Sequence, residues 1–355
     1  MKVSVIIPTY NRSKLLLEAA DSVLNQTYRD FEIIIVDDGS TDDTENQISR
    51  YSDKITYIKQ PNAGVNAARN RAISMARGDY IALLDSDDLW FDFKLELQVA
   101  LLEQYPDVGF VFSDFLIRKE SGNEIRSGLR TWHPPQRSWD AIYATKARHS
   151  FQGLAASPAD AQPEYDVYRG DIYYPSLFEP YVLPSTALIR RRCLDTDLRL
   201  VDHDSTCGDW DFFARLSHRY SAIFMDLETT VNRSHEDAVR LTRVPQQLQL
   251  ARRLNMIERI WKSDRHFYAR HHEEVDALEH GLLLTLATQQ ALNADIHAAR
   301  NTLRRRRRQN IRDYRIKDIV LTTCIRMPGA AWLLNTILLS KRVFAGLRAI
   351  GKVSS

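Results

Sequence analysis

Residues 3–43 read VSVIIPTYNRSKLLLEAADSVLNQTYRDFEIIIVDDGSTDD, and this stretch decides the fold. Residues 3–8 form a continuous apolar run, residues 15–24 carry apolar side chains at helical spacing, and residues 31–36 form a second apolar run. Short apolar runs bounded by polar turns predict strands that are buried on both faces. A strand, a helix and a second strand in this order predict a βαβ unit with a right-handed crossover.

The same alternation continues outward from this unit to residue 116. It predicts strands at 55–58, 80–84 and 108–116, and helices at 63–75 and 93–104. The fold class that we predict is therefore α/β, a doubly wound and mostly parallel sheet, followed by a C-terminal α-helical region. In such sheets ligands bind beyond the carboxyl ends of the strands.

Acidic side chains follow two of the predicted strands. They are Asp37 and Asp38 in one group, and Asp85, Asp87 and Asp88 in the other. The three carboxylates of the second group cannot all ionise at low cost without a cation. They are hard oxygen ligands, suited to Mg²⁺ or Mn²⁺ held jointly with substrate phosphates. Alternatively, these aspartates only cap helices and stabilise turns. This alternative is strongest for Asp37, which lies in the turn sequence DDGS. In the same stretch, Ser40 or Thr41 could cap the next helix.

The remainder of the chain is first irregular and then helical. Residues 118–180 are rich in Pro, Gly, Ser and Tyr, which predicts a long, partly ordered insertion. We expect the last strand of the sheet at 222–227. Beyond about residue 241, helical spacing at 248–261 and 275–293 predicts an α-helical region.

The net charge of +2 for 355 residues hides a strong asymmetry. From Arg300 onward 14 lysines and arginines stand against 2 acidic residues, whereas the preceding part of the chain has 34 against 44. A basic tail on an acidic body indicates an anionic partner. The apolar segment 319–339 approaches membrane-spanning length, but Arg326 and Pro328 interrupt it, so we expect helices that lie on a membrane or pack on a partner. The five arginines at 304–308 favour an anionic membrane over nucleic acid, since no nucleic-acid-binding module accompanies them.

Cysteine usage and the first residues bear on the compartment. The three cysteines are scattered and lack metal-ligand spacing, which argues against a disulfide framework. The opening run MKVSVIIPTYN is too short for the apolar region of a signal peptide and is interrupted by Pro8. We therefore expect a cytoplasmic protein with peripheral contact to the inner face of the cell membrane.

Several spaced motifs resemble the donor-binding half of family 2 glycosyltransferases with the GT-A fold: VSVIIPTYNR, LLEAADSVLNQTYRDFEIIIVDDGSTDDT and NAGVNAARNRAISMARGDYIALLDSDDLW. The resemblance covers residues 3–115, is looser over 180–240, and offers no motif beyond 241. It implies a catalytic domain followed by a basic helical region that associates with a membrane or a partner. The implied domains are a catalytic domain at 1–240 and a helical region at 241–355. The catalytic domain is divided into a nucleotide-sugar half at 1–117, an insertion at 118–180 and an acceptor half at 181–240.

The resemblance also implies roles for residues in these motifs. Asp85 and Asp87 form a D-x-D pair, in which Asp87 binds the divalent metal and Asp85 is shared between the metal and the donor ribose. Asp38 contacts the nucleotide base and ribose, often by accepting a uracil N–H. Arg69 could reach the base or the phosphates, or could form a salt bridge with a nearby aspartate. The other residues implied in the nucleotide pocket are Pro8, Thr9 and Tyr10.

The acceptor hydroxyl needs a base, because its proton must leave as the new bond forms. The family usually offers a Glu-Asp pair before an aromatic-rich helix, and the matching residues here are Gly208 and Asp209. Asp209 is thus implied as the catalytic base, Gly208 departs from the family pattern, and Asp211 is a competing candidate. His235 lies where many family members carry a histidine, and it could approach the metal or the diphosphate.

With this resemblance, the sequence predicts an inverting glycosyltransferase that uses Mn²⁺ or Mg²⁺. A UDP-sugar is the favoured donor, and the acceptor is a hydroxyl of a saccharide or lipid-linked glycan in cell-surface polysaccharide or glycan synthesis. Aromatic residues of the insertion and Trp210 could stack on acceptor sugars, and the helical region could form a homo-oligomer. The alternatives are a non-catalytic scaffold of the same fold and a sugar nucleotidyltransferase. The latter is disfavoured because no Gly-rich, Lys-containing loop follows the first strand.

Overall fold

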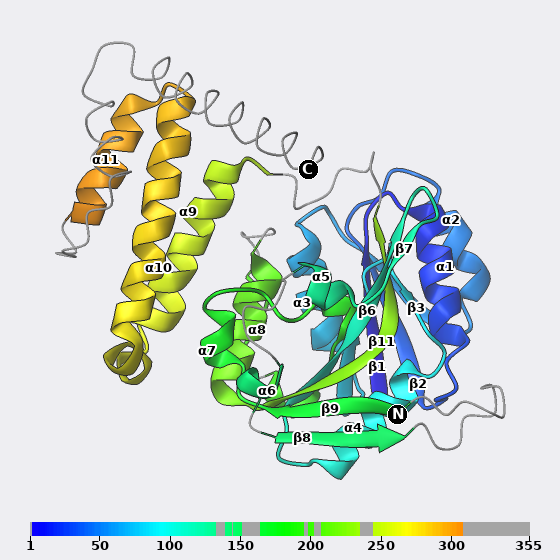
Figure 1. Ribbon diagram of the computed structural model, residues 1–355. Helices are drawn as coiled ribbons and strands as arrows, with labels where there is room; N and C mark the ends of the chain where they lie inside the picture. The colour runs from blue at the N-terminus through cyan, green and yellow to red at the C-terminus, as the bar shows by residue number, and fades with distance from the viewer. Residues whose placement is uncertain are drawn as a thin grey trace, which may run out of the picture. The chain divides into compact units, whose positions relative to one another are not determined.

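The computed structural model describes residues 2–132, 139–143, 145–150, 164–194, 198–201, 207–234 and 244–307. The chain separates into two compact units, Met1–Thr242 and Arg243–Ser355. Figure 1 labels helices of both units and several strands of the N-terminal unit.

The N-terminal unit is built on one mixed sheet. Its main path follows the order β3-β2-β1-β4-β10-β6-β11-β9-β8, in which β1 to β4 pair in parallel, as do β6 and β11, and β10 runs antiparallel between β4 and β6. The doubly wound, mostly parallel sheet predicted from the sequence is therefore confirmed. The strands are β1 (Val3–Thr9), β2 (Phe31–Asp37), β3 (Ile55–Lys59), β4 (Tyr80–Leu83), β6 (Phe110–Lys119), β8 (Thr145–Ser150), β9 (Glu164–Gly170), β10 (Leu188–Arg190) and β11 (Ala222–Ser234), with β5 (Leu89–Trp90) and β7 (Glu124–Ile125) at the margins.

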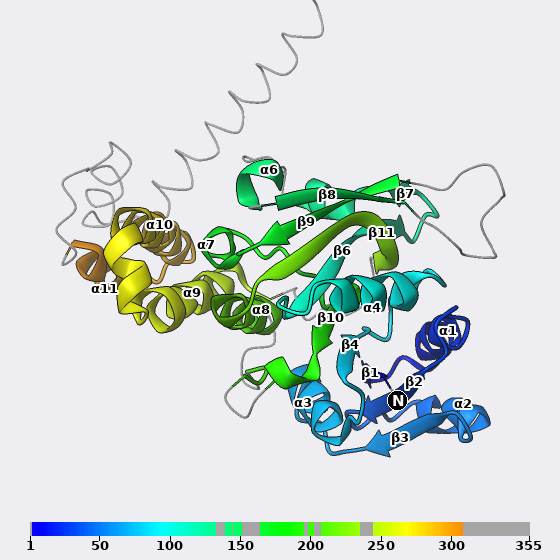
Figure 2. The same cartoon turned by 90° about the horizontal axis from the view of Figure 1, so that it is seen from below.

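The strands β1, β2 and β4 are mostly apolar because both faces of this part of the sheet are covered. In β1, Val5 and Ile7 belong to one hydrophobic layer and Ile6 to the other, as the alternation of strand side chains requires. Figure 2 shows helices on both sides of the sheet. The helices that complete the layers are α1 (Ser13–Leu24) and α4 (Lys94–Gln104) on one side, and α3 (Val65–Met75) and α8 (Gly208–Arg219) on the other.

Two segments are more regular than the sequence indicated. The last strand, expected at 222–227, extends to Ser234, and register shifts between Met225 and Thr230 interrupt its pairing with β6. Such a bulge breaks the alternation of side chains, which explains why the sequence pattern ended early. The insertion contributes β8 and β9, which extend the sheet beyond β11. It also carries the short helices α5 (Gly128–Trp132), α6 (Trp139–Ile142) and α7 (Tyr173–Ser176).

Aromatic residues of the insertion pack into the core. The ring centroids of Trp139, Tyr143 and Tyr168 lie 4.6, 6.1 and 6.0 Å from that of Phe224 in β11. All four side chains are buried. The expectation that insertion aromatics stack on an acceptor is therefore wrong for these three, because their burial against β11 leaves no face open. Trp210 is half-buried, and its indole Nε1 donates to a backbone carbonyl of α7 at 2.6 Å.

The C-terminal unit is helical, as predicted. Asp264 caps its longest described helix, because the carboxylate accepts the backbone N–H groups of His266 and Phe267. Among the described helices, none combines the length and the apolar character needed to cross a bilayer. The segment 319–339 and most of the basic tail lie outside the described residues. The helices are α9 (Gln246–Met256), the π-helical η4 (Ile257–Lys262), α10 (Arg265–Leu292) and α11 (Ile296–Arg307).

A buried ion-pair network joins three of these helices. Glu279 of α10 is fully buried, and its carboxylate pairs with Lys262 at 2.9 Å and with Arg305 at 2.8 Å. Arg305 also pairs with Glu258 at 3.0 Å. Arg305 belongs to the five-arginine run, so at least this arginine holds the helical unit together in addition to any external contact.

Replacing Glu279 by Ala should destabilise the C-terminal unit by about 1–3 kcal/mol, since it removes the buried carboxylate that pairs with Lys262 and Arg305. Urea unfolding followed by circular dichroism measures the loss. Glu273→Ala removes an exposed glutamate from the same helix and should change stability by less than about 0.5 kcal/mol. Equal effects of the two substitutions would contradict the role of the network.

Candidate active site

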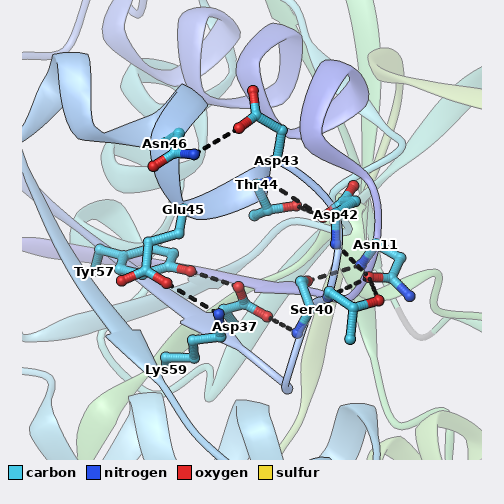
Figure 3. A network of polar contacts seen from close by, with 11 residues as sticks. Asn11, Asp37, Ser40, Asp42, Asp43, Thr44, Glu45, Asn46, Tyr57 and Lys59 are labelled. Carbon is cyan, nitrogen blue, oxygen red and sulfur yellow. Dashed lines mark hydrogen bonds and ion pairs between the residues drawn. The ribbon is translucent and has the colours of Figure 1, made fainter.

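The loop after β2 is held by its own polar side chains, as Figure 3 shows. The carboxylate of Asp37 accepts the backbone N–H of Ser40 at 2.7 Å and the hydroxyl of Tyr57. Asn11, just beyond β1, donates its backbone N–H to Ser40 Oγ and accepts the backbone N–H of Thr41 at 2.8 Å. Asp37 thus stabilises the turn, which is the structural role that the sequence analysis gave as its alternative. The expectation that Ser40 or Thr41 caps the next helix is wrong, because both are engaged by Asn11 and α2 begins at Thr44.

Asp38 organises the approach to α3. It is buried, and its two carboxylate oxygens accept the backbone N–H groups of Ala63 at 2.9 Å and Gly64 at 2.8 Å. Gly64 has a φ of 95°, a backbone conformation that favours glycine. The side-chain amide of Gln60 donates to the same carboxylate at 2.8 Å. Asp38 therefore fixes the loop that precedes α3, at the edge of the sheet where the sequence placed the nucleotide.

The other residues expected in the nucleotide pocket lie at the end of β1. Pro8 and Thr9 are buried, and the carbonyl of Thr9 accepts the backbone N–H of Asp38 at 2.8 Å. The buried hydroxyl of Thr9 has no hydrogen-bond partner among the described residues. Tyr10 is 47% exposed, although it is a large aromatic residue. The exposed Tyr10 ring offers an aromatic surface to a ligand at this edge.

Arg69 brings the two halves of the N-terminal unit together. Its side chain is 3% exposed, and its guanidinium pairs with Asp85 at 2.5 Å and with Asp209 at 2.6 Å. Asp85 follows β4, and Asp209 stands in the first turn of α8. Asp85 and Asp209, the two residues that the resemblance implied for the site, thus meet at one buried cation. In this structure Arg69 forms salt bridges with aspartates, which was one of the two possibilities that the sequence left open.

Asp209 remains accessible despite this contact, since 38% of its side chain is exposed. Desolvation by burial raises the pKa of its carboxyl group, while the charge of Arg69 opposes the rise. A carboxylate with a raised pKa is a stronger base. Asp211, the competing candidate, is buried and pairs with Arg215 at 2.7 Å, so its carboxylate supports α8 instead.

The three carboxylates after β4 have different surroundings. Asp88 is buried, and its carboxylate accepts hydrogen bonds from Ser185, Asn232 and the backbone of Arg233. Burial, together with the charges of Asp87 and Asp85, raises the pKa of Asp88 well above its ordinary value. The side chains of Asp85 and Asp87 are 25% and 21% exposed, and Asp87 pairs with Arg12 at 2.9 Å. The D-x-D pair is therefore the accessible part of the cluster, and Asp88 is its support.

The carboxylates of Asp85 and Asp87 suit a divalent cation that is bound jointly by the protein and a substrate. Within the described residues, no three His, Cys, Asp or Glu side chains form a complete metal site. Mg²⁺ is commonly bound by one or two carboxylates together with substrate phosphates and water. Asp85 and Asp87 can supply those carboxylates when Arg69 and Arg12 give up their ion pairs. His235, the third predicted ligand, lies outside the described residues.

Gly208 stands where the family usually has a glutamate, and the structure shows what occupies the space. A Cβ atom at this position would lie 2.2 Å from Nδ2 of Asn66. Asn66 is buried, donates to the carbonyl of Val201 at 2.9 Å and accepts a hydrogen bond from Arg69 at 3.2 Å. Asn66 thus needs a glycine beside it in order to support Arg69.

Sequence reasoning missed Asn66, Arg12 and Ser185. Ser185 lies in the turn η2 (Pro184–Thr186), donates to Asp88 and accepts the backbone N–H of Asp85 at 3.1 Å. Only Arg12 could have been found from the sequence, because it is a basic residue that closely follows the first predicted strand. The other two act through contacts with residues far away in the sequence.

Comparison with known families matches residues 4–156 to the model described as Glycosyl transferase family 2. An uncharacterized glycosyltransferase of Rickettsia felis is 47% identical over 130 residues, which are 36% of this chain and 21% of the relative. The Escherichia coli protein described as UDP-Glc:alpha-D-GlcNAc-diphosphoundecaprenol beta-1,3-glucosyltransferase WfaP is 42% identical over 120 residues, which are 33% of this chain and 47% of the relative. The chain thus spans less than half the length of these relatives.

Solved structures show the same fold at low identity. The mannosyltransferase PcManGT from Pyrobaculum calidifontis, in complex with GDP-Man and Mn²⁺, has a TM-score of 0.54 and 19% identity, covering 91% of this chain and 79% of its own. S. aureus TarS 1-349 in complex with UDP-GlcNAc has a TM-score of 0.52 and 18% identity, covering 85% and 88%. Both are GT-A-type glycosyltransferases, so the predicted GT-A fold is confirmed. Residues 4–156 of this chain therefore form a region that matches glycosyl transferase family 2.

Proposed function

We propose that the chain transfers a sugar from a nucleotide-diphosphate donor to an acceptor hydroxyl, with inversion at the anomeric carbon. The observation that carries the proposal is the convergence of Asp85 and Asp209 on the buried guanidinium of Arg69, beside the accessible carboxylate of Asp87. A donor-side carboxylate pair and a separate base are the parts that such a displacement needs.

The proposed chemistry at Asp209 is a proton transfer. The acceptor oxygen attacks the anomeric carbon, the bond from that carbon to the diphosphate breaks, and the acceptor proton passes to the Asp209 carboxylate. The exposure and raised pKa of Asp209 suit this role. Arg69 could then exchange its two carboxylate partners for the phosphates of the donor, since guanidinium groups bind both.

Asp87 and Asp85 would hold a divalent cation, Mn²⁺ or Mg²⁺, with the donor diphosphate. When bound, the cation neutralises charge on the departing diphosphate. Asp38, Thr9 and Tyr10 would accommodate the nucleoside at the end of β1. We favour a UDP-sugar, because the E. coli relative is described as using UDP-Glc and the TarS complex holds UDP-GlcNAc, whereas PcManGT is a complex with GDP-Man.

The proposed acceptor is a saccharide or a lipid-linked glycan, in polysaccharide or glycan synthesis. The E. coli relative is described as acting on a diphosphoundecaprenol-linked sugar, which supports this choice. We further propose residues 1–240 as the catalytic domain and 241–355 as a region that contacts an anionic membrane surface or forms a homo-oligomer. A peripheral position on the inner face of the cell membrane would bring the acceptor to the site.

The alternatives are less well supported. A scaffold that binds no donor would have no need for the partly exposed carboxylates of Asp85 and Asp87 beside a buried arginine. A sugar nucleotidyltransferase would need a basic phosphate-binding loop after the first strand. Pro8, Thr9 and Tyr10 stand there, although Arg12 follows them.

Asp209→Asn should lower turnover by about 10²–10⁴-fold, because an amide of nearly equal volume cannot accept the proton. Metal-dependent donor hydrolysis, in which water stands for the acceptor, measures turnover, and equilibrium titration should find donor affinity within about threefold of wild type. Asp211→Asn is the matched control on the same helix turn and should keep its turnover. Near-full turnover by Asp209→Asn would contradict the role of Asp209 as the catalytic base.

Gly208→Ala should destabilise the N-terminal unit by about 1–3 kcal/mol, since the added Cβ displaces Asn66 from its two hydrogen bonds. Turnover should fall as well, because Asn66 supports Arg69. In the double variant Asn66→Gly/Gly208→Ala the clash is absent, so the two stability losses should not add. Unfolding measurements on the four proteins of this cycle decide the matter, and strictly additive losses would show that the two residues act independently.

A further inference from the structure

A cavity separate from the acidic site of Asp85, Asp87 and Asp209 lies on the N-terminal unit, with a volume of about 640 Å³. It sits at the amino ends of β1 and β4, since Lys2 precedes β1, Tyr80 opens β4 and Arg190 pairs with Tyr80 across the sheet. The carboxyl ends of these strands lead to Thr9 and Asp85. The cavity and the acidic site therefore lie at opposite edges of the sheet.

Basic side chains dominate the described lining of this cavity. Among the residues that the structure describes, none of its four arginines forms an ion pair with a carboxylate. Cations gathered around one hollow raise its potential and attract an anion. The cationic lining residues are Lys2, Arg190, Arg191, Arg192 and Arg199, and the described carboxylate among them is Asp79.

Two of these arginines are fixed in the wall. Arg190 donates through Nε to the carbonyl of Val108 at 2.7 Å, and Arg192 donates to the carbonyl of Pro106 at 2.6 Å. Both therefore satisfy backbone groups just beyond α4. The side chains of Arg191 and Arg199 are exposed and form no side-chain hydrogen bond with another described residue. These two guanidinium groups are available to a ligand.

The backbone that carries Arg199 is held in place. The side-chain amide of Asn70 donates to the carbonyl of Leu200 at 2.8 Å and accepts its N–H at 3.1 Å. The carbonyl of Arg199 accepts a hydrogen bond from Arg215 at 2.5 Å. A wall fixed in this way reduces the ordering that a ligand must impose on binding.

We propose that this cavity binds an anion of the phosphate class, with Arg191 and Arg199 as its main contacts. Guanidinium groups match phosphate with pairs of parallel N–H···O bonds. The volume falls within the range of small-molecule sites, about 300–1,000 Å³. The ligand is distinct from the donor diphosphate proposed for the acidic site, since the cavity is at the other edge of the sheet. A soluble phosphate ester and the phosphate of a lipid headgroup would offer the same chemistry.

The test is calorimetric titration of the full chain with inorganic pyrophosphate at low salt, with a chelator present to suppress metal-dependent binding at the acidic site. Arg191→Ala/Arg199→Ala should weaken binding about tenfold or more, since charge-assisted hydrogen bonds are lost. Arg77→Ala is the control, because Arg77 is exposed, lies outside the lining and already pairs with Glu32. It should bind pyrophosphate as the wild type does.

Absence of binding by the wild type, equal affinity of the double variant, or an equal loss in Arg77→Ala would overturn the proposal. Sedimentation with vesicles of phosphatidylcholine, with and without phosphatidylglycerol, separates the two sources of phosphate. If the double variant loses both pyrophosphate and anionic vesicles, the site takes a lipid headgroup. If it loses pyrophosphate but still binds anionic vesicles as the wild type does, the site takes a soluble phosphate ester.

Discussion

The pairing of one buried guanidinium with two carboxylates is the constraint on which the site depends. Arg69 lies 16 residues from Asp85 and 140 from Asp209 in the sequence, and its side chain is 3% exposed. A buried charge that lost its partners would cost several kcal/mol. Correct packing of α8 against α3 therefore also assembles the candidate site, and Asn66 steadies the guanidinium from the side of Gly208.

The acidic loop is also held by a buried polar residue of the turn η2. Ser185 bonds both to Asp88 and to the backbone of Asp85. Lys94 in turn fixes η2, the segment that carries Ser185. This fully buried lysine donates hydrogen bonds to the side chain of Gln98 and to the carbonyl of Thr186. Its Nζ lies 4.5 Å from the centroid of the Trp90 ring. Burial lowers the pKa of Lys94 well below its ordinary value. Buried polar groups thus support the accessible carboxylates, as preorganised sites require.

Local patterns explain which features were predictable. The apolar runs of β1, β2 and β4 predicted a parallel sheet, because strands covered on both faces have no polar side. The same rule placed Asp38 and Asp85 at one edge. The double pairing of Arg69 could not be predicted, since it depends on a contact across 140 residues. The bulge in β11 hid the end of that strand, and the fit of Asn66 beside Gly208 involves only tertiary contacts.

The most direct test is equilibrium binding of UDP-sugars to the wild type and to Asp87→Asn, in Mn²⁺, in Mg²⁺ and in chelator. The site described here predicts that one donor binds the wild type only when metal is present. Its affinity should fall at least about tenfold in Asp87→Asn, whose amide is a poorer ligand for a hard cation. Donor binding that ignores both the chelator and the substitution would contradict the account, as would a folded wild type that binds no nucleotide sugar.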